Sequence, residues 1–101
     1  MMKLLQINYR LVSAVSEFMR ESKPVASALA NVSGLRWKIW LENDNENEGG
    51  GLYLFDDAAA LKSFIEGPIV AKLKAHPALV EVSVKEFDVP VELSSITRAP
   101  I

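Results

Sequence analysis

The sequence predicts an α+β domain of the ferredoxin-like class, with a four-stranded antiparallel sheet and both helical segments on one face. The first observation is the order of hydrophobic patterns, since period-two and helical spacings alternate as β-α-β-β-α-β. The second is a polar turn between the two middle strands, which is typical of a hairpin. The third is the length of 101 residues, half of them hydrophobic, which predicts one domain over residues 1–101.

The first strand is expected at Lys3–Arg10, where apolar and more polar side chains alternate. A helical segment should follow, with Ser13 as its N-cap and Gly34 as its stop. Pro24 falls inside this segment, so the helix should kink there or begin a second piece, because proline cannot donate a helical hydrogen bond. The apolar members of the strand are Leu5, Ile7 and Tyr9.

The middle of the chain predicts a long hairpin with arms at Leu35–Glu42 and Gly51–Phe55. The loop between them, Asn43–Gly50, is too polar to be buried. The three consecutive glycines at its end, Gly49 to Gly51, should supply the positive φ angles of a turn or bulge. Alternation places the two tryptophans on opposite faces, and we expect Trp37 to face the helices and Trp40 to face away from them.

Asp56 or Asp57 is expected to cap the second helical segment. Gly67-Pro68 should interrupt this segment, and His76-Pro77 should end it, because a residue before proline is pushed out of the helical region. The last strand is expected at Leu79–Val89.

Helices can cover only one face of such a sheet, so we expect aromatic and polar side chains together on the uncovered face. An apolar patch of this size usually marks an interface, and two such sheets packed face to face would form a barrel-like homodimer. The tail, residues 90–101, has no further element of its own chain to cover it and is expected along the partner subunit. The side chains assigned to the uncovered face are Gln6, Asn8, Lys38, Trp40, Tyr53, Phe55, Lys85 and Phe87.

Composition excludes several classes of protein. The net charge of −2 and the scattered lysines and arginines argue against a nucleic-acid partner, which requires a basic surface. The chain has no cysteine, hence no disulfide, thiolate metal site or cysteine nucleophile. No signal-peptide pattern and no run of about 20 apolar residues is present, so we expect a cytoplasmic protein without a membrane partner.

The acidic hairpin tip is a candidate metal site. From Asp44 onward the spacing mimics the start of a calcium loop, with Gly49 at the sixth position. The twelfth position, which requires a bidentate glutamate, is Phe55, so we expect no metal here and interpret the tip as a solvated turn. Nucleotide-binding and hydrolase motifs are also absent from the sequence.

Several motifs resemble the YdhR-type monooxygenases, which are small members of the dimeric α+β barrel superfamily. The specific part of the resemblance is the pair formed by Trp37-Lys38-Ile39-Trp40 and Gly50-Gly51-Leu52-Tyr53-Leu54-Phe55. Further matches are Leu4-Leu5-Gln6, Lys23-Pro24, Gly34-Leu35, Phe87-Asp88-Val89 and Leu93-Ser94, so the similarity extends over nearly the whole chain. Arg36 departs from the pattern, in which an apolar residue is expected.

The resemblance implies a homodimer and a monooxygenase activity without metal, flavin or haem, hence with no cofactor, on a small aromatic or quinol-like compound and O2. Such an enzyme holds an electron-rich phenolate and O2 in a dry pocket and stabilises the developing charge. Trp40, Lys38 and Asn8 are the candidate catalytic residues. The candidate substrate-binding residues are Trp37, Tyr53, Phe55, Phe87 and Arg36.

The sequence also allows other interpretations of these residues. The aromatic residues could form the core of a dimer, and the protein could be a non-catalytic homodimeric module that binds a small ligand or regulates by association. Lys38 could pair with a carboxylate rather than with a substrate anion. His76, the only histidine, could be a solvent-facing helix end, a general base, or, together with Asn8, part of a haem-degrading site.

Overall fold

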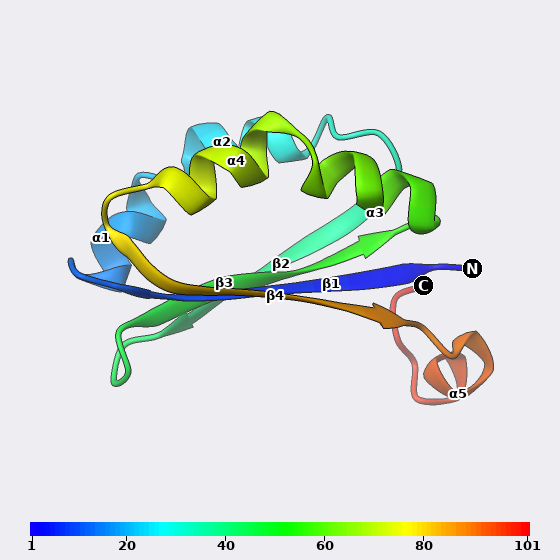
Figure 1. Ribbon diagram of the computed structural model, residues 1–101. Coiled ribbons are helices and arrows are strands. Elements are labelled where there is room, and N and C mark those ends of the chain that lie inside the picture. Colours follow the sequence, from blue (N-terminus) through cyan, green and yellow to red (C-terminus); the bar gives the residue numbers. More distant parts are fainter.

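The structure, a computed structural model, describes all of residues 1–101. Its elements form one antiparallel sheet in the strand order β2-β3-β1-β4, with the helices α1 to α4 in a layer over one face (Figure 1). The short helix α5 and the C-terminus lie on the other side, at one end of the sheet (Figure 1). The predicted ferredoxin-like class is therefore confirmed. The elements are β1 (Lys3–Leu11), α1 (Val15–Arg20), α2 (Lys23–Leu29), β2 (Leu35–Asn43), β3 (Glu48–Phe55), α3 (Ala58–Ile65), α4 (Pro68–Ala75), β4 (Leu79–Asp88) and α5 (Val91–Ile96).

The predicted helix breaks are confirmed where local chemistry dictates them. Pro24 lies in the first turn of α2, and Pro68 lies in the first turn of α4, so each helical segment is split into two pieces. The Asp57 carboxylate accepts a hydrogen bond from the Ala60 N–H over 2.8 Å and caps α3. Gly34 has a φ of 79° and provides the left-handed residue between α2 and β2.

The start of α1 differs from the prediction, because its cap comes from the hairpin tip and not from Ser13. The Asn47 side-chain oxygen accepts a hydrogen bond from the Val15 N–H over 2.9 Å. The Asn47 amide nitrogen donates to the carbonyl oxygens of Leu11 and Ser13 over 2.7 and 2.8 Å. Asn47 itself has a φ of 49°, a region that asparagine tolerates better than most residues. This one side chain therefore fastens the β2–β3 turn to the connection between β1 and α1.

The three glycines of the hairpin lie inside β3 and do not form its turn. None of them has a positive φ, so the prediction that they supply the turn geometry is wrong. Their role is close packing: a Cβ on Gly49 would lie 2.8 Å from the Tyr9 ring, and a Cβ on Gly50 would lie 2.1 Å from the Ile7 carbonyl oxygen. Glycine is required at such approaches because any side chain would displace the neighbouring strand.

The facing of the hairpin is the reverse of the prediction. In the sheet register Leu5 is opposite Tyr53, and Tyr53 is opposite Lys38, so these side chains share the helix-covered face. Trp40 and Phe55 lie on this face as well, whereas Trp37 lies on the uncovered one. In β2 the cause is a register shift between Leu35 and Trp37, at Arg36, which changes the side of every later residue of β2 relative to Leu35. In β3 the facing follows from the pairing of Tyr53 with Leu5 of β1. The assignment of Gln6, Asn8, Lys85 and Phe87 to the uncovered face is in accord with the register.

The core lies between the sheet and the helices. On the uncovered face, Ile39 and Phe87 remain 48% and 43% exposed. The chain end is held at this face, because the Trp37 indole N–H donates a hydrogen bond to the Pro100 carbonyl oxygen over 2.8 Å. The tail therefore contacts its own sheet. The core residues are Leu5, Ile7, Tyr9, Leu11, Val15, Leu29, Tyr53, Phe55, Leu61, Phe64, Val70 and Leu79.

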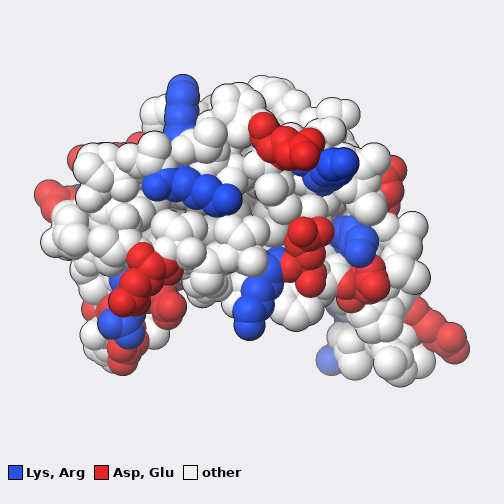
Figure 2. Space-filling view, viewed as in Figure 1, with Lys and Arg blue, Asp and Glu red and all other residues white.

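Charged side chains of both signs are mixed over the face seen in Figure 2, and no continuous basic surface occurs on it. None of the helices combines the length and the apolar character needed to cross a lipid bilayer.

Candidate functional site

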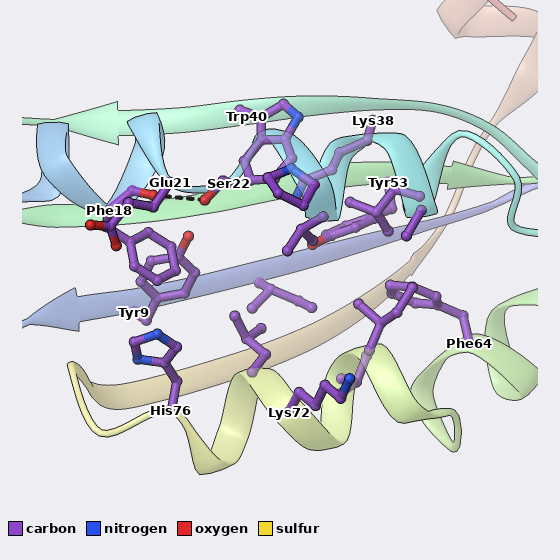
Figure 3. Close-up of a pocket in the computed structure, with 18 residues that line it drawn as sticks. Tyr9, Phe18, Glu21, Ser22, Lys38, Trp40, Tyr53, Phe64, Lys72 and His76 are labelled. Carbon is purple, nitrogen blue, oxygen red and sulfur yellow. Dashed lines mark hydrogen bonds between the residues drawn. The ribbon is translucent and has the colours of Figure 1, made fainter.

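A cavity of about 480 Å³ lies between the helical layer and the sheet (Figure 3). Twelve of its eighteen lining residues are hydrophobic, and its volume falls in the range of pockets that hold small organic ligands. The sheet contributes the floor and the four helices contribute the walls. The lining residues from the sheet are Ile7, Tyr9, Lys38, Trp40 and Tyr53, and those from the helices and their ends include Phe18, Ser22, Leu29, Phe64, Val70, Lys72 and His76.

Lys38 brings the only positive charge of the cavity floor. Its Nζ atom lies 3.2 Å from the centroid of the Trp40 ring and 4.6 Å from that of Tyr53. The four ion pairs of the structure involve other residues, so no carboxylate neutralises this amine. Burial lowers the pKa of Lys38 from 10.5 to about 7. Near neutral pH the same group can therefore serve as a cation or as a base.

Gly51 explains why Lys38 lies flat over the sheet floor. A Cβ at this position would stand 2.6 Å from the Lys38 Cε atom and 3.2 Å from the Tyr53 ring. Without a side chain at 51, the lysine stem can cross this part of β3 between Trp40 and Tyr53. The glycine is thus the local sequence feature that allows the amine to reach the aromatic rings.

Two tyrosine hydroxyls open into the same cavity. The rings of Tyr9 and Tyr53 are buried, with 4% of each residue exposed. Neither hydroxyl has a hydrogen-bond partner in the protein. Every fully buried side-chain oxygen or nitrogen does have a partner, so these two hydroxyls are not fully buried and must border open space. The space that both residues line is the cavity. Burial raises the pKa of Tyr9 to about 12, and burial followed by the charge of Tyr9 raises the pKa of Tyr53 further. Both hydroxyls therefore remain protonated donors at neutral pH.

One end of the cavity is closed by aromatic contacts between α1 and the end of α4 (Figure 3). The Phe18 ring lies edge-on to Tyr9, with centroids 5.5 Å apart, and edge-on to His76, at 5.3 Å. The His76 Nδ1 atom accepts a hydrogen bond from the Ala78 N–H over 3.1 Å, which occupies that nitrogen at the end of the helix. His76 is solvent-exposed and lines the cavity rim. It lies on the opposite side of the sheet from Asn8, so the two cannot form one haem-degrading site.

A second cavity of about 330 Å³ lies between α2 and the edge strand β2. It shares Leu29, Lys38 and Trp40 with the first cavity, so these side chains separate two spaces. Trp37 and Arg36 line only the second cavity. The Arg36 guanidinium is exposed and lies 3.6 Å from the Asp56 carboxylate.

The structure therefore distributes the candidate residues over different places. It brings together Lys38, Trp40 and Tyr53 in the main cavity. Asn8 lies on the uncovered face and accepts a hydrogen bond from the Gln6 amide over 2.8 Å. Phe87 lies on that face too, and Phe55 is fully buried against Phe64 without lining the cavity. No group of three or more histidine, cysteine, aspartate or glutamate side chains is placed to hold a metal ion.

Sequence reasoning missed several cavity residues. Tyr9 carried a usable signal, because it follows Leu5 and Ile7 at alternate positions of the strand that faces the helices. For Phe18 and Leu29 the sequence carried no signal other than helical spacing, because their access to the cavity depends on how the four short helices pack over the sheet. Ser22 is buried, and its hydroxyl donates to the Phe18 carbonyl oxygen over 2.8 Å within the helical layer.

Comparison with known proteins identifies the family. The family model described as "Putative mono-oxygenase ydhR" matches residues 4–100. No curated protein matches the chain. Among solved structures, SnoaB, a cofactor-independent oxygenase from Streptomyces nogalater, is 19% identical, with 87% of this chain and 92% of that one covered and a TM-score of 0.70. Rv0793 from Mycobacterium tuberculosis is 13% identical, with 88% and 95% covered and a TM-score of 0.72. Both are similar in fold.

Proposed function

This chain belongs to the mono-oxygenase ydhR family, and we propose that it is a cofactor-independent mono-oxygenase of a small aromatic, quinol-like compound. The substrate would occupy the cavity between the sheet and the helices. The similarity of the fold to SnoaB, which is a cofactor-independent oxygenase, supports this reading.

The observation that carries the proposal is a set of three polar groups without partners in an apolar cavity: the Lys38 amine and the hydroxyls of Tyr9 and Tyr53. Polar groups that have no partner in the protein and open into a largely apolar cavity can bind a ligand that supplies the partners, so their presence at one cavity favours a ligand site. An aromatic ligand with a phenolic oxygen has the matching chemistry. Its ring would pack on Trp40 and Phe64, and its oxygen would meet the amine and the hydroxyls.

The proposed reaction begins with removal of a proton from the substrate phenol by the neutral Lys38 amine. The resulting ammonium and the two tyrosine hydroxyls then stabilise the phenolate. One-electron transfer from the electron-rich phenolate to O2, followed by recombination, forms a peroxide at a ring carbon that carries one hydrogen, and the Lys38 ammonium returns its proton to this peroxide. Loss of water then breaks the O–O bond and that C–H bond and leaves a carbonyl. One oxygen atom thus enters the substrate, and the other leaves in water with the hydrogen of that carbon and the proton first taken from the phenol.

The test is oxygen uptake by chelator-treated protein with a panel of quinols and naphthols. Lys38→Met should lower the rate by about a hundredfold, which is the scale of a lost general base. Tyr53→Phe should lower it less, because Tyr9 remains as a donor. Lys62→Met, which removes an exposed lysine on α3, is the matched control and should retain the rate. Equal uptake by wild type and Lys38→Met would overturn the assignment.

A second copy of the chain is proposed to cover the uncovered sheet face, giving a homodimer. The support is the exposure of Ile39 and Phe87 there, together with partly exposed Leu4, Leu41 and Leu52. The mass in solution tests this: a species of twice 11.1 kDa is expected, and a monomer at all concentrations would contradict it.

A non-catalytic, ligand-binding module is the second candidate, because a cavity with free donors can bind an aromatic compound without oxidising it. Quenching of tryptophan fluorescence by a quinol, with no oxygen consumed, would favour this alternative.

A further inference from the structure

Lys38 differs from the other six lysines of the chain in its surroundings. Lys3 pairs with the Asp88 carboxylate over 2.6 Å, and the remaining five are exposed to solvent. Lys38 is instead enclosed by Trp40, Tyr53 and the helical layer, and has neither an ion-pair nor a hydrogen-bond partner. An amine in this position is free to react, because no carboxylate holds it as an ammonium.

We propose that Lys38 is a carbonyl-reactive amine that captures aromatic aldehydes and ketones in the cavity as imines. This inference uses the same cavity as the proposed function but does not depend on oxygenase chemistry. It assigns a second ligand class, aryl carbonyl compounds, and a covalent and reversible mode of binding.

The chemistry of the step is balanced by groups of the cavity. The neutral amine forms a C–N bond to the carbonyl carbon, and the carbonyl oxygen takes up the amine proton to give a carbinolamine. The hydroxyl of this intermediate then leaves as water, assisted by proton donation from the Tyr9 or Tyr53 hydroxyl, and the second amine proton is returned to the tyrosine. The product is a neutral imine, C=N, and no oxidant or reductant is consumed.

Three features of the cavity favour the imine. First, a neutral imine removes a positive charge that has no ion-pair partner among largely apolar walls, whereas at an exposed lysine the charge is solvated. Second, Lys38 Nζ lies at the face of the Trp40 ring, so an aryl group attached there stays among aromatic walls. Third, burial keeps the pKa of this amine near 7, so a large fraction is unprotonated at neutral pH.

The position of the amine depends on Gly51, which we assign as a positioning residue. A Cβ at 51 would meet the Lys38 Cε at 2.6 Å and would force the lysine stem away from Tyr53. Because Gly51 does not have a positive φ, alanine is compatible with its backbone. Gly51→Ala therefore tests the direction of the amine without removing it.

The experiment uses 2-naphthaldehyde as the probe, with cyanoborohydride at pH 7 to reduce any imine to a stable secondary amine. Intact mass and peptide mapping then locate the adducts. We expect Lys38 to be modified at least about tenfold faster than any other lysine, because a lysine with an ordinary pKa is almost fully protonated at this pH. 2-Naphthol, which has no carbonyl group, should slow the reaction by competing for the cavity.

Variants separate the outcomes. Lys38→Arg keeps a cation but cannot form an imine, so the fast adduct should disappear while slow adducts remain. Lys62→Arg should retain the fast adduct, and Gly51→Ala should slow it several-fold. Adducts spread evenly over all lysines, or an unaltered fast phase in Lys38→Arg, would overturn the inference. Fast adduct formation without oxygen uptake would support imine formation at Lys38 and contradict the proposed mono-oxygenase activity. Oxygen uptake without a fast adduct would support the mono-oxygenase activity and contradict imine formation.

Discussion

The unpaired lysine of the cavity should weaken the fold at neutral pH, and Lys38→Met should stabilise the protein. A fall in pKa from 10.5 to about 7 corresponds to about 5 kcal/mol of difference between the charged and neutral forms. Lys38 retains partial solvent contact, which screens part of this effect. We therefore expect Lys38→Met to raise the free energy of unfolding by about 2–4 kcal/mol at pH 7, since methionine fills a similar volume without a charge.

The pH dependence gives this prediction its sign. Between the folded pKa of about 7 and the ordinary value of 10.5, the unfolded chain holds a proton on Lys38 that the folded chain does not hold. The wild-type fold therefore gains stability as pH rises through this window, and it loses that gain as pH falls toward 7. The difference in free energy of unfolding between Lys38→Met and wild type should therefore fall by about half or more between pH 7 and 9.5. Above that range the raised pKa values of Tyr9 and Tyr53 act in the opposite direction.

Urea unfolding followed by tryptophan fluorescence at pH 7, 8.3 and 9.5 provides the measurement. Lys62→Met is the control, because it removes an exposed lysine and should change stability little and equally at each pH. A Lys38→Met variant that is less stable than wild type at pH 7 would refute the reasoning. A stability difference that does not change with pH would refute it equally, because the contacts with Trp40 and Tyr53 would then outweigh desolvation.

Three further predictions follow from other parts of the structure. Asn47→Ala removes three hydrogen bonds and places alanine at a φ of 49°, so the free energy of unfolding in urea should fall by about 2–4 kcal/mol. Asn47→Gly relieves only the backbone strain and should recover about 1 kcal/mol of this loss. An unchanged unfolding midpoint in Asn47→Ala would contradict the fastening role of this side chain. Oxygen uptake should rise with pH through about 7 as Lys38 loses its proton, and this acid limb should be missing in Lys38→Met; an identical profile would exclude Lys38 as the base. Ile39→Glu together with Phe87→Glu should shift the proposed dimer toward monomer in light scattering, while an unchanged mass would place the interface elsewhere.

The sequence was sufficient for those features that a few neighbouring residues determine. Pro24, Asp57 and the Gly67-Pro68 step act through local backbone chemistry, and each ends or begins a helix as predicted. The order of elements follows from hydrophobic periodicity, and it defines the fold class. These parts required no knowledge of distant contacts.

The facing of the hairpin could not be obtained in this way. Alternation in β2 pointed to the wrong side, because Trp37, Ile39 and Leu41 share one side whereas Trp40 is the only large apolar residue beside Lys38 and Glu42 on the other. The register shift at Arg36 depends on the pairing of β2 with β3. The role of Gly51 depends on a contact between neighbouring strands, because the Lys38 side chain lies against this glycine. The motif that carries the family resemblance did lead to Lys38, Trp40 and Tyr53, although these side chains lie on the face opposite to the one expected for them.

The hydrogen bond from Trp37 to Pro100 has a practical consequence for handling the protein. Any residues added after Ile101, such as an affinity tag, would begin beside the indole of Trp37, on the sheet face that a second copy is proposed to cover. Met1, in contrast, is 79% exposed. Oligomeric state should therefore be compared between versions tagged at either end, because a fusion at the C-terminus could itself decide whether two sheets can meet.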